Sequence, residues 1–107
     1  MPLVAPLRVS LEIELTAGPA AGQRRFRLTR SLAWPAVRLA CDAPLPLEGQ
    51  GTARVRFDLP TGERIEADAL VFCDPEDPER GSEVELRGLT AERLALLEAY
   101  VEKRGLP

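Results

Sequence analysis

Histidine is absent from this chain of 107 residues, and cysteine occurs only twice. Without histidine, the molecule lacks the commonest metal ligand and the commonest general base. The two cysteines, Cys41 and Cys73, are too far apart in the sequence to form a Cys-x-x-Cys metal or redox motif. They are predicted to be buried thiols in a reducing compartment, with a disulfide between them as the less favoured alternative.

An excess of positive charge is also missing, since 14 basic residues stand against 17 acidic ones and the net charge is −3. Proteins that bind nucleic acid usually carry a basic field, so no nucleic-acid partner is predicted. No apolar run approaches the roughly 18 residues that a membrane-spanning helix needs, and no secretion signal is recognisable at the start. The prediction is a cytoplasmic protein without membrane insertion.

Nucleophile motifs and glycine-rich phosphate loops are absent as well. The acidic residues are spread over predicted strand surfaces, apart from a proline-broken loop at 74–81 that fits a calcium site poorly. We therefore expect no catalytic residue, no metal site and no enzymatic activity.

What the chain does contain is alternation of apolar and polar residues, the period of a half-buried strand. The segment RVSLEIEL is the clearest example, with every second residue apolar. Strands are predicted at 8–15, 24–29, 36–41, 52–59, 64–73 and 82–86, within a β region of about 7–87. Proline and glycine mark the segment 42–51 as a loop.

The last segment has the period of a helix instead. Thr90 is predicted to cap a helix that extends to about residue 104. Its apolar face is formed by Leu94, Leu97, Tyr100 and Val101, while Leu96 falls partly outside it. The whole chain, 1–107, is thus predicted to be one mainly β domain: a small six-stranded antiparallel barrel with one C-terminal α-helix.

These segments, in this order, resemble the PilZ domain family. RVSLEIEL corresponds to the opening strand, VRLACDAPLPLEGQGTARVRFDLPTGERIEADALV to the central meander, and LTAERLALLEAYVEKR to the closing helix. The resemblance implies a bacterial regulatory domain with a PilZ-like barrel. The usual ligand of the family is cyclic di-GMP, which is bound through an RxxxR motif before the first strand and a (D/N)xSxxG motif between the second and third.

Both motifs are incomplete here. The second arginine of RxxxR matches Arg8, which puts Val4 at the first. In the other motif, Ser31 stands at the Asp/Asn position, Ala33 at the serine and Ala36 at the glycine. The resemblance therefore implies a degenerate PilZ domain without the standard cyclic di-GMP site and with no cofactor. Such a domain acts as a non-enzymatic adaptor or regulator through protein contacts, in motility, pilus or signalling pathways.

The candidates for those contacts come from four arginines within seven residues, from Arg38 on the next predicted strand and from the single tryptophan. A solvated face balanced by nearby carboxylates is the favoured interpretation of the arginines, and partner or anion recognition is the alternative. Trp34 lies in a predicted Ser-Leu-Ala-Trp-Pro turn, as either a buried plug or an exposed anchor. The partner-contact candidates are Trp34, Arg25, Arg27 and Arg38.

Two other functions remain open from the sequence. The chain could be a cyclic di-GMP receptor that uses non-standard groups, for which the residual candidates are Arg8, Ser31, Arg24 and Arg30. It could also be a structural subunit that forms homo-oligomers through strand edges or the helix.

Overall fold

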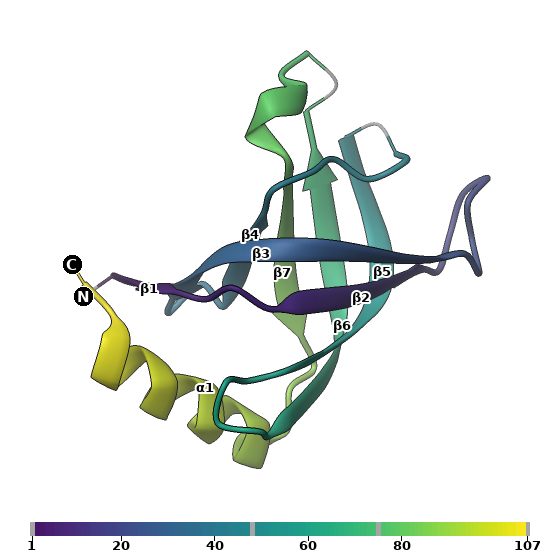
Figure 1. Cartoon of the computed structure of the whole chain (residues 1–107). Coiled ribbons are helices and arrows are strands. Elements are labelled where there is room, and N and C mark those ends of the chain that lie inside the picture. Colours follow the sequence, from purple (N-terminus) through teal and green to yellow (C-terminus); the bar gives the residue numbers. More distant parts are fainter. Residues whose placement is uncertain (1, 48, 75, 107) are drawn as a thin grey trace.

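The computed structural model describes residues 2–47, 49–74 and 76–106. Within them the chain forms seven β-strands, a short 3-10 helix and one α-helix (Figure 1). The elements are β1 (Leu3–Pro6), β2 (Ser10–Leu15), β3 (Arg24–Trp34), β4 (Arg38–Cys41), β5 (Gly49–Asp58), β6 (Arg64–Cys73), η1 (Pro78–Arg80), β7 (Ser82–Arg87) and α1 (Ala91–Arg104).

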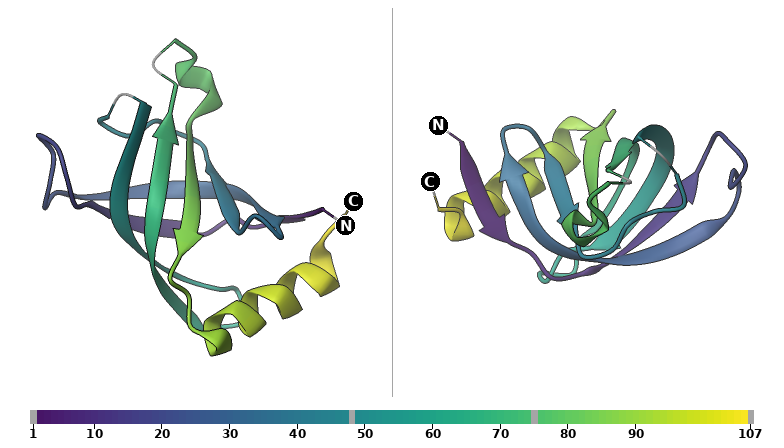
Figure 2. Two further views of the ribbon diagram at one scale, coloured as in Figure 1. Left: turned by 180° about the vertical axis from the view of Figure 1, so that it is seen from behind. Right: turned by 90° about the horizontal axis from the view of Figure 1, so that it is seen from above.

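The strands form one antiparallel sheet in the order β1-β3-β2-β5-β6-β7-β4, and an additional pairing of β3 with β4 closes it. The result is a closed six-stranded antiparallel barrel with one extra strand and a single C-terminal helix, so the predicted fold class is confirmed. The extra strand is β1, which pairs with the last residues of β3 beyond β2 (Figure 2).

The alternating apolar residues of the strands fill the barrel. Every second residue of β2, β6 and β7 is buried, and so is every second residue of β5 from Ala53 to Phe57, because successive side chains of a strand point to opposite faces. The core continues under the helix, where the Tyr100 hydroxyl donates a hydrogen bond to the Pro6 carbonyl at 2.6 Å. The chain termini lie side by side, since Val4 forms an isolated β-bridge with Leu106 (Figure 2).

The helix starts as predicted, with the Thr90 hydroxyl accepting a hydrogen bond from the Arg93 N–H at 3.2 Å. Its apolar face is rotated slightly from the expected one. Leu97 and the two residues at 100 and 101 are buried, but Leu94 is 38% exposed while Leu96 packs partly against the core. No helix in the described part of the chain is long and apolar enough to cross a membrane.

One strand was missed, and the boundaries of two others were wrong. The strand β1 was not foreseen, because a four-residue stretch that follows one proline and ends in another has little β signal of its own and is held by β3 and Leu106. The strand β3 continues through Trp34, so the Ser-Leu-Ala-Trp-Pro segment is mostly strand and the turn follows it. The strand β5 starts at Gly49, inside the predicted loop, because β6 is long enough to pair with it there.

Candidate functional site

The structure reverses the two faces of β3: the arginines predicted to face solvent lie in the inward phase of the strand. Arg25 pairs with the fully buried Ile13, and Thr29 of the same face is itself fully buried. Arg25 and Arg27 therefore belong to the inward phase of the strand, at the end of the barrel, whereas Phe26 is 61% exposed and Leu28 is 44% exposed. A solvated face of arginines on this strand was thus the wrong interpretation for these two residues.

The physical reason is a bulge. The register between β3 and β4 shifts between Thr29 and Ser31, so Arg30 is an extra residue. Leu32, after the bulge, must face the core, and the shift places the odd-numbered residues before the bulge on the inward side. Local alternation cannot reveal such a change of phase.

Arg25 and Arg27 bind nearby uncharged groups. The Nε of Arg27 donates to the Pro44 carbonyl and one of its terminal nitrogens donates to the Phe26 carbonyl, both at 2.9 Å. Arg25 donates to the side-chain oxygen of Gln23 at 2.6 Å, while its own Nε is buried without a partner. Among the described residues, no carboxylate forms an ion pair with either arginine, so nearby carboxylates do not balance their charge.

Arg38 lies on a different surface. It faces outward from β4 opposite Ala33, eight residues along β3 from Arg25, which is roughly 25 Å of extended strand. The four partner-contact candidates therefore do not form one surface. Trp34 is partly buried against the core and pairs with Leu3 of β1, so it is neither a fully buried plug nor a free anchor.

The guanidinium of Arg38 lies over the ring of Phe72, with its central carbon 5.8 Å from the ring centroid. Two carboxylates of β7 hold it there, Glu83 at 3.8 Å and Glu85 at 3.6 Å. A hydrogen bond from Arg87, and the charge of Arg38 more weakly, lower the pKa of Glu85 below its ordinary value, so this carboxylate stays ionised.

Next to this pair is a groove with a volume of about 540 Å³. It lies on the outside of the barrel, where β4, β6 and β7 meet the start of β5. Its lining residues are Arg38, Gly49, Gln50, Phe72, Cys73, Asp74, Arg80, Gly81 and Glu83. Of these, only Arg38 is a partner-contact candidate of the sequence analysis. Phe72 could have been noticed as an aromatic residue on the outward phase of an otherwise clear strand.

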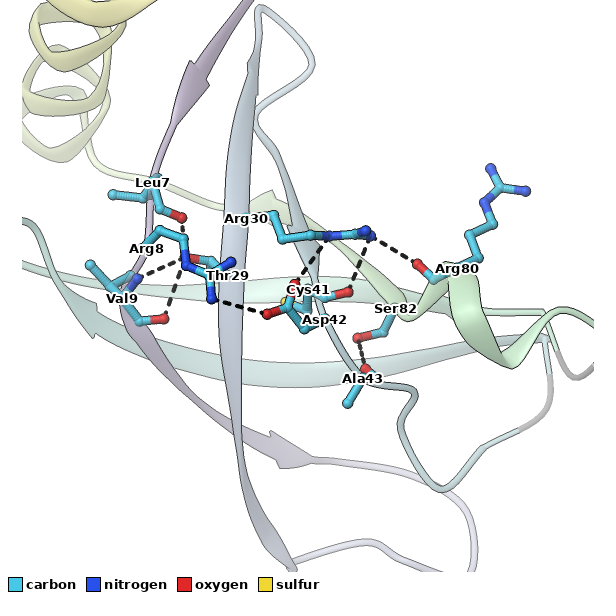
Figure 3. A network of polar contacts seen from close by, with 10 residues as sticks. All are labelled: Leu7, Arg8, Val9, Thr29, Arg30, Cys41, Asp42, Ala43, Arg80 and Ser82. Carbon is cyan, nitrogen blue, oxygen red and sulfur yellow. Dashed lines mark hydrogen bonds and ion pairs between the residues drawn. The ribbon is translucent and has the colours of Figure 1, made fainter.

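The residual nucleotide candidates are only partly brought together (Figure 3). Arg8 and Arg30 both approach Asp42, at 3.3 Å and 3.4 Å, although they come from different parts of the chain. Arg30 also donates to the carbonyls of Cys41 and Arg80, at 3.4 Å and 3.0 Å. The shared carboxylate of Asp42 was missed because it lies in the loop after β4, far from both arginines in sequence.

The other two residual candidates, Arg24 and Ser31, do not join Arg8 and Arg30 at the Asp42 carboxylate. Arg24 lies 4.0 Å from both Glu12 and Glu14 on the outer face of β2. Ser31 pairs with Ala40 on one side and with Pro6 on the other. The pairing of β1 with β3 also places Val4 directly opposite Ala33, so positions assigned to the two PilZ motifs are cross-strand neighbours.

Both cysteines are buried, as predicted, and both are free. Burial is the main cause that raises the pKa of the Cys41 thiol to about 11. A thiol with that pKa is protonated at neutral pH and is a poor nucleophile. Within the described ranges, no group of three or more cysteine, aspartate or glutamate side chains is placed to hold a metal ion.

Comparisons with protein-family models, with curated protein sequences and with solved structures gave no match for this chain. Its function is therefore inferred from the geometry of these surfaces.

Proposed function

We propose that this chain is a non-enzymatic PilZ-type adaptor or regulator that acts through protein contacts, in a cyclic di-GMP-related motility, pilus or signalling pathway. It does not use the standard cyclic di-GMP site. The observation that carries the proposal is the groove beside Arg38 and Phe72, which we assign as the main contact surface.

The composition of the groove supports a protein partner. Arginine and aromatic residues are enriched among the side chains that dominate binding energy at protein interfaces. Arg38 is already held by two carboxylates and by the Phe72 ring, so little conformational entropy is lost when a partner binds it. The Arg38 side chain is still 42% exposed, so a bound segment can contact it.

The positions of the motif residues support a PilZ-type domain that has lost its usual ligand. Val4 and Ala33 are neighbours on the outer surface, where the family would place an arginine and a serine. Neither side chain can bind a phosphate or a guanine edge by hydrogen bonds. At the position of the glycine, Ala36 adds a methyl group.

A second function, cyclic di-GMP reception by non-standard groups, is favoured by one observation. Arg8 and Arg30 converge on a single point, as a phosphate clasp requires. In the free protein, however, that point is occupied by the Asp42 carboxylate. Phosphate binding would have to displace this carboxylate and overcome its repulsion, so we favour the adaptor.

Isothermal titration with cyclic di-GMP separates the two functions. We expect no heat and no thermal stabilisation at about 100 μM nucleotide, because the groups of the standard site are missing. Even a ligand with a Kd of that size would stabilise the fold by only tenths of a kcal/mol. Binding in the micromolar range or tighter would overturn the proposal in favour of a receptor.

The contact surface is tested by quantitative affinity capture from a lysate of the source organism. The baits are the wild type, Arg38→Ala, Phe72→Ala and, as a control, Arg54→Ala. Arg54 is an exposed arginine of the same barrel exterior whose partner, Asp68, lies outside the groove. We expect proteins that the wild type and Arg54→Ala retain and the two groove variants lose. If all four folded baits capture the same proteins, the groove is not the contact surface.

A further inference from the structure

The first half of β3 has a free edge. Residues 24–28 pair with β2 on one side, and on the other side the last backbone bond is donated by the Asp42 N–H to the Leu28 carbonyl at 3.0 Å. Strand residues direct their backbone groups alternately to the two sides, so those of Arg24 and Phe26 also point to this edge. No strand pairs with them there in the part of the chain that the structure describes (Figure 1).

One side chain already substitutes for the missing strand. Arg27 donates to the Phe26 carbonyl at the edge and to the Pro44 carbonyl across from it. Charged side chains on edge strands commonly prevent unwanted pairing in this way. A guanidinium held by two carbonyls can exchange them for a carboxylate, with which it forms stronger charge-assisted bonds.

The edge has a different chemistry on each of its faces. On the outer face, Phe26 and Leu28 expose 61% and 44% of their surface. On the inner face are Arg25 and Arg27, neither of which forms an ion pair with a described carboxylate. A strand added to this edge would meet apolar side chains on one face and guanidinium groups on the other.

We propose that the free edge of β3 binds an extended segment of a partner protein in which acidic and apolar residues alternate. The segment adds to the sheet as a further strand, with its carboxylates toward Arg25 and Arg27 and its apolar side chains over Phe26 and Leu28. This inference rests on the proposed function, since it gives the chemistry of a partner, but it concerns a surface separate from the groove.

A second copy of the chain does not fit the edge. Two β3 edges paired antiparallel around Phe26 would place Arg25 of one copy opposite Arg27 of the other, at both ends of the contact. Like charges directly opposite one another destabilise a sheet. The partner must therefore bring the carboxylates that this chain does not provide at the edge.

The test is a titration of 15N-labelled protein with the peptide acetyl-Thr-Val-Glu-Val-Glu-Val-Thr-amide, followed by NMR. A peptide with lysine in place of both glutamates is the control. We expect saturable shifts of the amides of residues 23–28, Asp42 and Ala43, with at least a tenfold preference for the acidic peptide. No saturable shift of the Phe26 amide at 1 mM acidic peptide, or an equal response to both peptides, would overturn the proposal.

A charge-swap variant gives an independent test. The double substitution Arg25→Glu and Arg27→Glu should reverse the preference, so that the lysine peptide binds better than the acidic one. The variant Arg54→Ala should keep the wild-type preference, because its side chain lies on the outer face of β5. A folded double variant with an unchanged preference would contradict the proposal. This double variant keeps Arg38 and Phe72. If its peptide preference is unchanged but it still captures the proteins that depend on the groove, only the assignment of the β3 edge has failed.

Discussion

The hydroxyl of Thr29, in the middle of β3, accepts a hydrogen bond from the backbone N–H of Val9 at 3.0 Å (Figure 3). The same hydroxyl donates to the Leu7 carbonyl at 2.5 Å. It thereby satisfies two backbone groups of the segment that connects β1 to β2. Since Thr29 is fully buried, water cannot replace these bonds without a change in packing.

Replacing Thr29 by valine should lower the free energy of unfolding by about 1–3 kcal/mol, because the shape is kept while the Val9 N–H and the buried Leu7 carbonyl lose their partner. Urea denaturation measures this loss. The matched control is Thr52→Val. The Thr52 hydroxyl is hydrogen-bonded at the surface to that of Thr16, so its removal should lower the free energy of unfolding by less than about 0.5 kcal/mol. Equal losses in the two variants would mean that the Thr29 hydroxyl does not hold the segment.

Gly81, which lines the groove, is required for two separate reasons. Its φ is +77°, and a Cβ at this position would lie 2.0 Å from the Cys41 carbonyl oxygen. Gly18 has a similar φ of +85° but open space around it, so it isolates the conformational effect. Gly18→Ala should cost about 1–2 kcal/mol for the left-handed conformation alone, and Gly81→Ala at least about 2 kcal/mol more. Thermal unfolding of both variants tests this, and similar losses would contradict the close contact.

The Cys41 thiol makes stability depend on alkaline pH. Its pKa is raised from 9.0 to about 11 in the folded protein, chiefly by burial. Below pH 9 the thiol is protonated in both states and its environment does not oppose folding. Between pH 9 and 11 only the unfolded state loses the proton, so the free energy of unfolding should fall with rising pH, by about 2–3 kcal/mol in total.

The comparison that isolates this effect is between the wild type and Cys41→Ala. Removing the buried sulfur costs packing energy that does not depend on pH. The difference in free energy of unfolding between the two proteins should nevertheless shrink from pH 9 to pH 11, because the variant has no thiol to titrate. If the two curves of free energy of unfolding against pH stay parallel over this range, burial does not raise the pKa of the Cys41 thiol as expected.

The barrel could be predicted from the sequence wherever one face of a strand is buried along its whole length. Ile65, for example, belongs to an alternating segment that was predicted over its full length, and Val55 to one that was predicted except at its start. The phase of β3 was not predictable in this way. Its bulge at Arg30 is imposed by pairing with β4, and the end of the barrel exposes Phe26 while Arg25 and Arg27 point inward.

The candidate surfaces were even harder to predict from the sequence, because each is assembled from distant parts of the chain. Arg38 meets Phe72 only because β4 and β6 both pair with β7. Asp42 joins Arg8 and Arg30 across the start of β2 and the bulge of β3. Composition identified arginines as the important residue type, but the contacts that distinguish one arginine from another depend on the sheet order, which periodicity does not determine.

The PilZ resemblance can be tested by restoring the motifs. The fourfold variant Val4→Arg, Ser31→Asp, Ala33→Ser and Ala36→Gly completes RxxxR with Arg8 and also completes the second motif. Val4 is 48% exposed, so the new arginine can reach solvent without disturbing the core. If the barrel is PilZ-like, the variant should bind cyclic di-GMP at micromolar Kd in isothermal titration, whereas we expect no binding by the wild type.

A further substitution, at Asp42, extends the same experiment. It pairs with Arg8 at 3.3 Å and would compete with the nucleotide phosphate for that guanidinium. Adding Asp42→Asn to the fourfold variant should therefore tighten binding further, while Asp42→Asn alone should not create binding, because Val4 and Ala33 offer no phosphate or guanine contacts. A control with Val4→Gln instead of arginine keeps the length but not the charge, and it should bind at least tenfold more weakly. A folded fourfold variant that fails to bind would mean that the resemblance does not extend to the ligand surface, and that the adaptor must be explained without a PilZ origin.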